Sequence, residues 1–338
     1  MKVLVIKRDK LGDMLLTTPL LAHLKASRPD AQLHLLANDY NAWVVAGNPN
    51  VDRLWVYRRV RHGGRVSVSA ALGWLWQTHL LRRERYDWVI VANGDESPRA
   101  IARGLSVRGA RTVAYCAQPS GYPSLTDPLA PVRDAHEMDR LLGMLAPLDI
   151  PIPDASIAPR YVLPEASAAF AQDWLAERGL ATGGYVVLGL GARRPKKQPS
   201  TNQVLRWSAH FKAAYGLDTV FMWTPGKSDD PLYPGDDATA QPVLEARSPQ
   251  IHPHRGPLQE ALGLVWGARA SIFPDSGLMH FAAASPGGVL GLFAETDVSP
   301  SPVQWAPRGK RAHWLDAPKS VTELAEAVVY ERMRRLLA

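Results

Sequence analysis

The stretch of residues 275–284 constrains the fold more than any other part of the sequence, because a short apolar run lies on each side of it. The runs at 270–273 and 288–293 have the length and composition of buried strands. A strand, a helix and a second strand in this order form a βαβ unit, with the turn at the carboxyl end of the first strand. The stretch therefore predicts an α/β fold with a parallel sheet.

The start of this predicted helix has the features of an anion-binding site. Asp275 or Ser276 can cap the helix, and Gly277 lets the backbone come close to a ligand. The first amides then point, without backbone partners, into the crevice at the end of the strand, where phosphate is a common ligand. An ordinary helix cap with no ligand fits the same residues. His280, in the first turn, could donate a hydrogen bond to a phosphate or simply pack in the core.

The same alternation of strand and helix begins at the first residues. A strand is expected at 3–6, a polar loop at 7–13 and an apolar-periodic segment up to 25, with Pro19 either at a helix start or in a kink. Both alternatives place Gly12 and Asp13 at the carboxyl end of the strand, where open α/β sheets hold ligands. Further strands are expected at 32–37, 53–57, 88–92, 111–115, 185–190 and 218–223, and helices at 40–46, 68–85, 97–105, 136–145, 166–178, 202–215, 258–266 and 322–337.

A proline-rich segment at 147–164 divides the chain into two halves of similar architecture. We expect a Rossmann-like domain at 1–160, a second at 161–320, and a C-terminal helix at 321–338 that could pack back on the N-terminal domain. Two facing doubly wound domains with a ligand cleft between them are the simplest arrangement.

Charge and composition narrow the classes of function. The net charge of +7 favours an anionic partner. The only cysteine, Cys116, excludes an internal disulfide framework and any multi-cysteine metal site. No carboxylate cluster or His-x-x-x-His motif suggests a tightly bound metal. No apolar run is long enough for a signal-peptide core or a membrane span, so we expect a soluble protein that is not exported.

Two basic loops are candidate sites for anions. The first, at 58–65, is either a solvated loop or a polyanion site, and its arginines are Arg58, Arg59, Arg61 and Arg65. The second follows the strand at 185–190, where Gly-Leu-Gly at 189–191 lacks the third glycine and the ribose acid of a dinucleotide fingerprint. The cations of this loop, at 193–197, could neutralise the charge of a diphosphate leaving group without a metal.

Such a site suits transfer of a group from a nucleotide-activated donor. Asp13 could deprotonate an acceptor hydroxyl, or it could equally be a helix cap or a salt-bridge partner. Asp95, which follows the strand expected at 88–92, is the next candidate for the base.

Two motifs about 260 residues apart resemble the lipopolysaccharide heptosyltransferases, glycosyltransferase family nine. The first comprises Val-Leu-Val-Ile-Lys-Arg at 3–8, Leu-Gly-Asp-Met-Leu at 11–15, Thr-Pro at 18–19 and Arg-Pro-Asp-Ala at 28–31. The second comprises residues 275–284, with Leu-Phe at 292–293 and Thr-Asp at 296–297.

The resemblance implies a GT-B fold with an N-terminal acceptor domain and a C-terminal nucleotide-sugar domain. It implies an inverting, metal-independent transfer of heptose from ADP-heptose to an inner-core sugar of lipopolysaccharide. The expected partners are the donor and an anionic lipid-linked acceptor, with no further cofactor and no nucleic acid. The expected location is the cytoplasmic face of the inner membrane, as a peripheral protein.

Position by position, the resemblance implies that Asp13 is the general base and Lys197 faces the donor phosphates. It matches Asp275, Ser276, Gly277 and His280 to the donor-binding signature of the family. The charge of the two basic loops adds Arg194 and Lys196 to the expected donor-binding residues and gives Arg58, Arg59, Arg61 and Arg65 as the expected acceptor-binding residues. A GT-B transferase with another nucleotide sugar or a protein acceptor is an alternative. A non-catalytic polyanion-binding protein is a further alternative, and it predicts salt-sensitive binding to nucleic acid.

Overall fold

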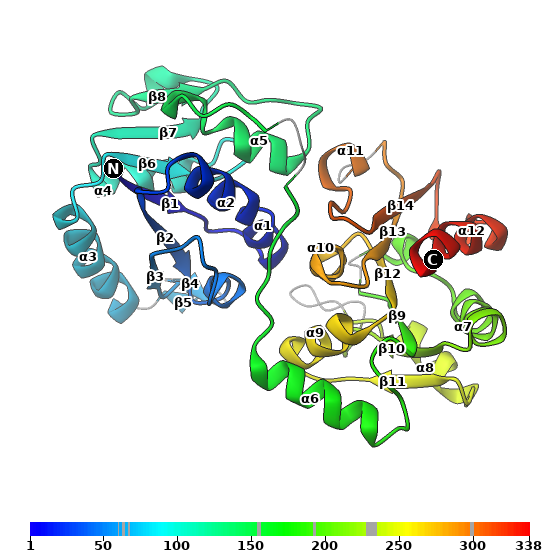
Figure 1. Cartoon of the computed structure of the whole chain (residues 1–338). Coiled ribbons are helices and arrows are strands. Elements are labelled where there is room, and N and C mark those ends of the chain that lie inside the picture. The colour runs from blue at the N-terminus through cyan, green and yellow to red at the C-terminus, as the bar shows by residue number, and fades with distance from the viewer. Residues whose placement is uncertain are drawn as a thin grey trace. The chain divides into compact units, whose positions relative to one another are not determined.

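The computed structural model describes residues 1–59, 61–62, 65–66, 68–153, 157–191, 194–227, 235–297 and 301–338, without the side chains of 61–68 and 71. The chain divides into two compact units, Met1–Val162 and Leu163–Ala338 (Figure 1). Each unit has its own sheet and its own core, and each is described separately below.

The first unit is built on a parallel sheet. Its described elements are β1 (Lys2–Ile6), α1 (Leu11–Leu15), α2 (Thr18–Ser27), β2 (Gln32–Asn38), η1 (Ala42–Val45), β3 (Arg53–Tyr57), β4 (Arg61–His62), β5 (Arg65–Val66), α3 (Val68–Arg83), β6 (Trp88–Val91), α4 (Pro98–Val107), β7 (Arg111–Tyr115), η2 (Pro119–Gly121), β8 (Asp127–Leu129), α5 (Glu137–Gly143) and η3 (Ala146–Leu148). The strand order is β3-β2-β1-β6-β7-β8, with parallel pairing between neighbours. Successive strands are therefore added on one side of β1 as far as β3, and then on its other side from β6 onwards, so the strand order reverses between β1 and β6.

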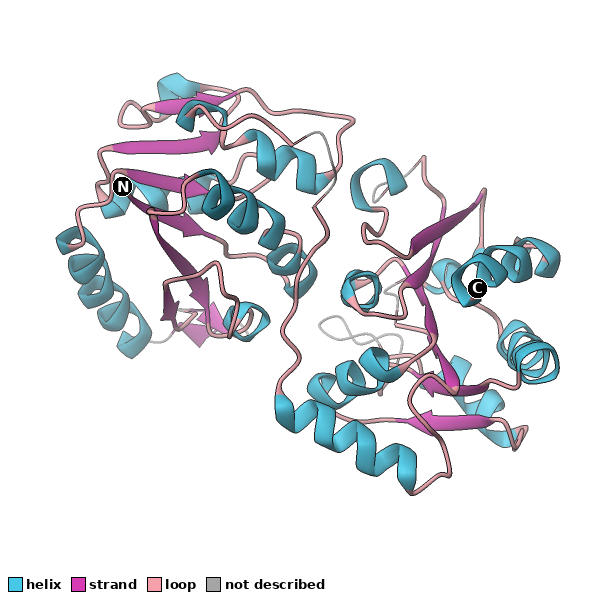
Figure 2. Ribbon diagram, in the orientation of Figure 1, coloured by secondary structure: helices cyan, strands magenta, loops and turns pink. Residues whose placement is uncertain are grey.

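Alternation along β1 places its side chains in two layers. Leu4 and Ile6 belong to a buried cluster with Leu81 of α3 and Val107 of α4. The ribbon views show α3 and α4 on one side of the sheet and α1, α2 and α5 on the other (Figure 2). This is the doubly wound arrangement, in which a strand buried on both faces reads as a continuous apolar run.

The second unit repeats this plan. Its described elements are α6 (Glu165–Ala176), β9 (Tyr185–Gly189), η4 (Pro195–Lys197), α7 (Thr201–Tyr215), β10 (Asp218–Met222), α8 (Asp237–Glu245), β11 (Ile251–His254), α9 (Leu258–Gly267), β12 (Ala270–Pro274), α10 (Gly277–Ala284), β13 (Val289–Ala294), α11 (Pro302–Trp305), β14 (Ala312–Ala317), η5 (Val321–Glu323) and α12 (Glu326–Leu337). The strand order is β11-β10-β9-β12-β13-β14, and neighbouring strands are again parallel. The strand order reverses between β9 and β12.

Period-two alternation along β9 also divides the second core. Val186 and Leu188 pack with Trp207 of α7 and Met333 of α12, whereas Val187 packs on the side of α6, α9 and α10. Gly189, the last residue of β9, leaves room for a neighbouring aromatic ring. A Cβ atom there would lie 2.2 Å from Cε1 of Phe273 on β12.

The fold differs from the sequence expectations at several places. The edge strands β8, β11 and β14 and the helix α8 were not expected, and proline residues lie within β8, β11 and α8. The predicted helix from Thr322 begins instead with the short turn η5, and α12 starts at Glu326. The buried residues of α12 belong to the second core, where it contacts β13 and α7.

The basic segment after β3 was expected to be a loop. Its described backbone instead forms an antiparallel pair of short strands, with Arg61 opposite Val66 and His62 opposite Arg65. The side chains of Arg61 and Arg65 lie outside the described residues.

Candidate active site

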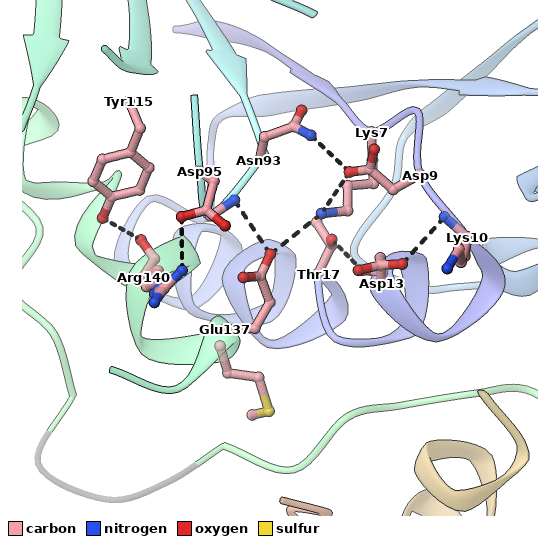
Figure 3. Close-up of polar contacts among 12 residues, drawn as sticks. Lys7, Asp9, Lys10, Asp13, Thr17, Asn93, Asp95, Tyr115, Glu137 and Arg140 are labelled. Atoms are coloured by element: carbon pink, nitrogen blue, oxygen red, sulfur yellow. Dashed lines mark hydrogen bonds and ion pairs between the residues drawn. The ribbon is translucent and has the colours of Figure 1, made fainter. Parts of the chain in front are cut away.

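Polar and charged side chains of the first unit gather where its strand order reverses. Residues that follow β1 and residues that follow β6 meet at this edge of the sheet, which is the place where doubly wound sheets bind ligands. Asn93, after β6, donates from Nδ2 to Oδ2 of Asp9, after β1, over 2.7 Å. Figure 3 shows this group of polar residues around Lys7.

Lys7 lies at the centre of the group and its side chain is fully buried. Its Nζ is 3.2 Å from Oδ2 of Asp9 and 3.7 Å from Oε1 of Glu137, in two ion-pair contacts. Burial by itself would lower the pKa of this amine, but the carboxylates of Asp9, Asp13 and Glu137 raise it above its ordinary value. The buried lysine is therefore charged.

Glu137 is the buried carboxylate that faces Lys7 from α5. His136 caps this helix, because its Nδ1 accepts a hydrogen bond from the backbone N–H of Met138. The N–H of Gly94 donates to Oε1 of Glu137 over 3.2 Å, and a Cβ atom on Gly94 would lie 2.1 Å from Oε2. Burial raises the pKa of Glu137, while Lys7 opposes this shift.

Asp13 is half-buried in α1, beside this group. Its Oδ2 accepts a hydrogen bond from the backbone N–H of Lys10 over 3.2 Å, so the carboxylate does cap the helix. Burial raises the pKa of Asp13, and the charges of Lys7 and Lys10 lower it. The capping role considered from the sequence is thus present, but it leaves Asp13 at the wall of a pocket.

That pocket has a volume of ≈ 460 Å³ and lies entirely within the first unit. Its lining residues come from the loop after β1, from α1, from the end of β2 with the turn that follows it, and from the segment after β3. They are Arg8, Asp9, Lys10, Asp13, Asn38, Tyr40 and Arg59. An acid with a raised pKa, cations and an aromatic ring in one concave site are suited to binding and deprotonating a polar, anionic substrate.

Arg59 connects the basic segment to this pocket. Its guanidinium pairs with Asp39 over 3.0 Å and lies 5.0 Å from the ring centre of Tyr40. Arg58, next to it, is exposed. The structure therefore brings Arg59, one of the two predicted arginines whose side chains it describes, to the same pocket as Asp13.

Asp95, the second candidate for a base, has a different environment. Its Oδ1 lies 2.8 Å from Nη1 of the buried Arg140, and the backbone carbonyl of Arg140 accepts a hydrogen bond from the hydroxyl of Tyr115 (Figure 3). Asp95 forms an ion pair with α5 and does not line the pocket that contains Asp13.

The second unit has its own group of charged residues where its strand order reverses. Nζ of Lys197, after β9, lies 2.5 Å from Oδ2 of Asp275, after β12, and Lys197 is buried while Asp275 is partly buried. The neighbouring Lys196 is exposed and forms an ion pair with Glu295. The hydrogen bond from Lys196 lowers the pKa of Glu295, and the charge of the exposed Arg194 adds to this shift.

The start of α10 lies beside the pair of Lys197 and Asp275. Ser276 is the residue before the helix, but its side chain does not cap it, and the buried Oγ has no hydrogen bond within the described part of the chain. Gly277 is the first helical residue. His280 is buried, with its ring 6.4 Å from that of Trp305.

Several residues of these groups were not expected from the sequence. Lys7 directly follows an apolar strand, and a charged residue at that position is a signal that could have been used. Asn93 carries the same signal, because it directly follows the strand expected at 88–92. Glu137 lies within an expected helix and carries no such signal, and its contact to Lys7 joins segments far apart in the chain.

Solved glycosyltransferases share this fold along the whole chain. A glycosyl transferase family 9 structure from Veillonella parvula has a TM-score of 0.79 at 21% identity, and the match covers 99% of this chain and 97% of that one. Escherichia coli heptosyltransferase WaaC with ADP has a TM-score of 0.75 at 18% identity, with 99% and 100% covered. The two doubly wound units define a GT-B glycosyltransferase fold.

The sequence comparison identifies the family. The model of glycosyltransferase family 9 (heptosyltransferase) matches residues 75–323, and the chain belongs to this family. Lipopolysaccharide heptosyltransferase 3 of Escherichia coli (strain K12) is 26% identical over 299 residues, which cover 85% of this chain and 80% of that protein. The matched range contains Lys197, Asp275 and Glu137, whereas Asp13 lies before it.

No helix within the described ranges combines the length and the apolar character needed to cross a membrane.

Proposed function

We propose that the protein transfers a heptose from ADP-heptose to an anionic inner-core sugar of lipopolysaccharide, with inversion and without a metal. The proposal rests on one observation. In each unit of this family 9 chain, a cluster of charged side chains lies at the point where the strand order reverses. The cluster of the first unit contains Asp13 beside a pocket, and that of the second contains the buried Lys197 beside the start of α10.

Asp13 is the proposed general base. Its carboxylate takes the proton of the acceptor hydroxyl as that oxygen forms a bond to the anomeric carbon of the heptose. Burial supports this role, because it raises the pKa of Asp13 and brings the acid closer to the operating pH, while the charges of Lys7 and Lys10 oppose this shift. The bond between the anomeric carbon and ADP breaks in the same step, and ADP leaves with the bonding electrons.

The proposed donor site lies in the second unit. Lys197 and the first amides of α10 stabilise the negative charge that develops on the diphosphate of the leaving ADP. Asp275 holds Nζ of Lys197 at this edge, and the buried hydroxyl of Ser276 offers a further donor. Arg194, Lys196 and His280 are proposed to complete the contacts with the donor.

The basic segment is the proposed acceptor side. Arg59 lies on the pocket of Asp13, so it can bind a phosphate or carboxylate of the acceptor near the reacting hydroxyl. Arg58, Arg61 and Arg65 precede and follow it in the same unit. The proposed location is the cytoplasmic face of the inner membrane, where a lipid-linked acceptor would be available.

A transfer assay tests the proposal. The protein is incubated with ADP-heptose and a panel of truncated core acceptors, with and without EDTA, and the products are weighed by mass spectrometry. A gain of one heptose that persists in EDTA is expected, and NMR of the product should show the inverted anomer. Transfer from another nucleotide sugar alone, or to a protein alone, would assign the fold a different substrate.

A further inference from the structure

The outward face of α3 is apolar, which is unusual for a helix at the surface of a domain. Leu72, Leu75 and Trp76 are 62%, 65% and 64% exposed, the largest values among the large hydrophobic residues that the structure describes. A surface helix ordinarily directs polar residues outwards and apolar residues to the core. Three exposed apolar side chains on one helix therefore indicate a binding surface.

These residues form one continuous face. Their spacing of three and four positions places them together on the helix, and His79 and Arg83 continue the same line. The ring of His79 stacks on that of Trp76, with centroids 5.7 Å apart. We call this set of five residues the α3 outer face. The opposite side of α3 carries Leu81, which packs in the core.

The sequence around the α3 outer face is strongly basic. Within residues 58–85 the only acid is Glu84, and the arginines are Arg58, Arg59, Arg61, Arg65, Arg82, Arg83 and Arg85. Glu84 is already paired with Lys2 over 2.8 Å and with Arg53 over 2.7 Å. The acid of this segment therefore does not neutralise its exposed cations Arg58, Arg83 and Arg85.

We propose that the α3 outer face docks on the surface of an anionic lipid bilayer. The apolar side chains of this face, Leu72, Leu75 and Trp76, enter the interface between headgroups and acyl chains. The exposed Arg83 and Arg85 bind the lipid phosphates. Apolar residues that include a tryptophan, beside a cluster of cations, are the pattern of helices that lie in such an interface. The inference rests on the proposed function in one respect, because a lipid-linked acceptor would bring the first unit to a membrane.

A second copy of the chain fits this surface less well. A symmetric contact would place the same face of two copies together, so that Arg83 and its basic neighbours would repel their counterparts. The charge of the surface thus favours an anionic partner over self-association.

Co-sedimentation with vesicles tests this inference on the full chain. Vesicles of equal parts phosphatidylethanolamine and phosphatidylglycerol should bind the protein, whereas pure phosphatidylcholine should bind it much less. The triple variant Leu72→Gln, Leu75→Gln, Trp76→Gln should bind the anionic vesicles at least about tenfold more weakly, because it loses its apolar insertion. Arg83→Gln should weaken binding about fivefold.

A matched control uses exposed apolar residues elsewhere. Val303 and Val328 are 58% and 47% exposed in the second unit, and their exchange for glutamine should leave vesicle binding unchanged. Equal thermal melting temperatures would show that all variants are folded. Equal vesicle binding by the native chain and the triple variant would overturn the proposal.

Two further measurements separate the possible outcomes. Light scattering that detects a native dimer, lost in the triple variant without vesicle binding, would assign the face to a second copy and overturn the membrane proposal. Transfer to a water-soluble, delipidated acceptor should be retained in the triple variant. Vesicle binding without any transfer by the native chain would reject the proposed function and support the docking surface.

Discussion

Nζ of Lys7 lies 3.7 Å from Oε1 of Glu137, and both side chains are buried. The lysine follows β1 and the glutamate begins α5, so this ion pair joins the start of the first unit to a helix near its end. Each charge compensates the other where neither could be solvated by water. The pair also places a cation close enough to influence the pKa of Asp13.

The Lys7 pair makes a prediction about stability. Lys7→Met should lower the free energy of unfolding by about 3–5 kcal/mol, because it leaves the buried Glu137 carboxylate uncompensated. Urea denaturation measures this change. Adding Glu137→Gln to the variant should recover part of the loss. The control Lys25→Met, which breaks the surface pair of Lys25 and Asp52, should cost about 0–1 kcal/mol. Equal small losses in both single variants would contradict a structural role of the buried pair.

Asp13→Asn should lower kcat by about 10²–10⁴-fold, because general-base assistance typically contributes a factor of that size. Binding of ADP should remain, since Asp13 belongs to the first unit and the proposed ADP site to the second. Steady-state kinetics with saturating acceptor measures the loss. Asp95→Asn is the comparison, because Asp95 is paired with Arg140 and should be dispensable for the chemistry. The reverse result, with Asp95 essential, would assign the base to Asp95.

The pH profile of the reaction should reflect the environment of Asp13. A base must be deprotonated to act, and burial raises the pKa of Asp13, so kcat/KM should fall on the acid side at a higher pH than an ordinary aspartate would give. Lys10 is exposed, and its charge lowers the pKa of Asp13. Lys10→Gln should therefore move the acid limb to still higher pH. Lys25→Gln should leave the limb in place, and a shift of equal size there would point to a general effect of net charge.

ADP should raise the melting temperature in the presence of EDTA, because a ligand that binds only the folded chain stabilises it. Lys197→Ala should greatly reduce this shift, since it removes the buried cation of the second unit. Lys196→Ala, which removes an exposed cation paired with Glu295, should have a smaller effect. A melting-temperature shift that disappears in EDTA but survives Lys197→Ala would contradict a metal-free donor site.

The arginines of the basic segment should act on the acceptor and not on the donor. Arg58→Gln with Arg59→Gln should raise the acceptor KM by about tenfold or more, because charge-assisted hydrogen bonds to an anionic group are lost. The KM for ADP-heptose should change little. Arg99→Gln, on the exposed side of α4, is the control. Equal losses for both substrates would indicate a disturbed fold instead of a lost acceptor contact.

Local patterns determined the plan of both units. Apolar runs flanked by polar turns located β1, β6, β9 and β12, because a strand buried on both faces leaves an uninterrupted apolar signal. The edge strands β8, β11 and β14 were missed, because a strand with one neighbour tolerates proline and exposed polar residues. The same local patterns placed Asp13, Lys197 and Asp275 after strands, where ligands bind.

Only the tertiary structure decided which of these residues meet. Lys197 and Asp275 form a pair because β9 and β12 are neighbours in the sheet, an order that follows from the crossover of the chain and not from local sequence. Glu137 reaches Lys7 in the same way, from a helix that no pattern connects with β1. The sequence by itself determined the central strands, most of the helices, the family motifs and the candidate acids and cations. The packing of distant elements determined their partners, their burial and hence the charge state that each can hold.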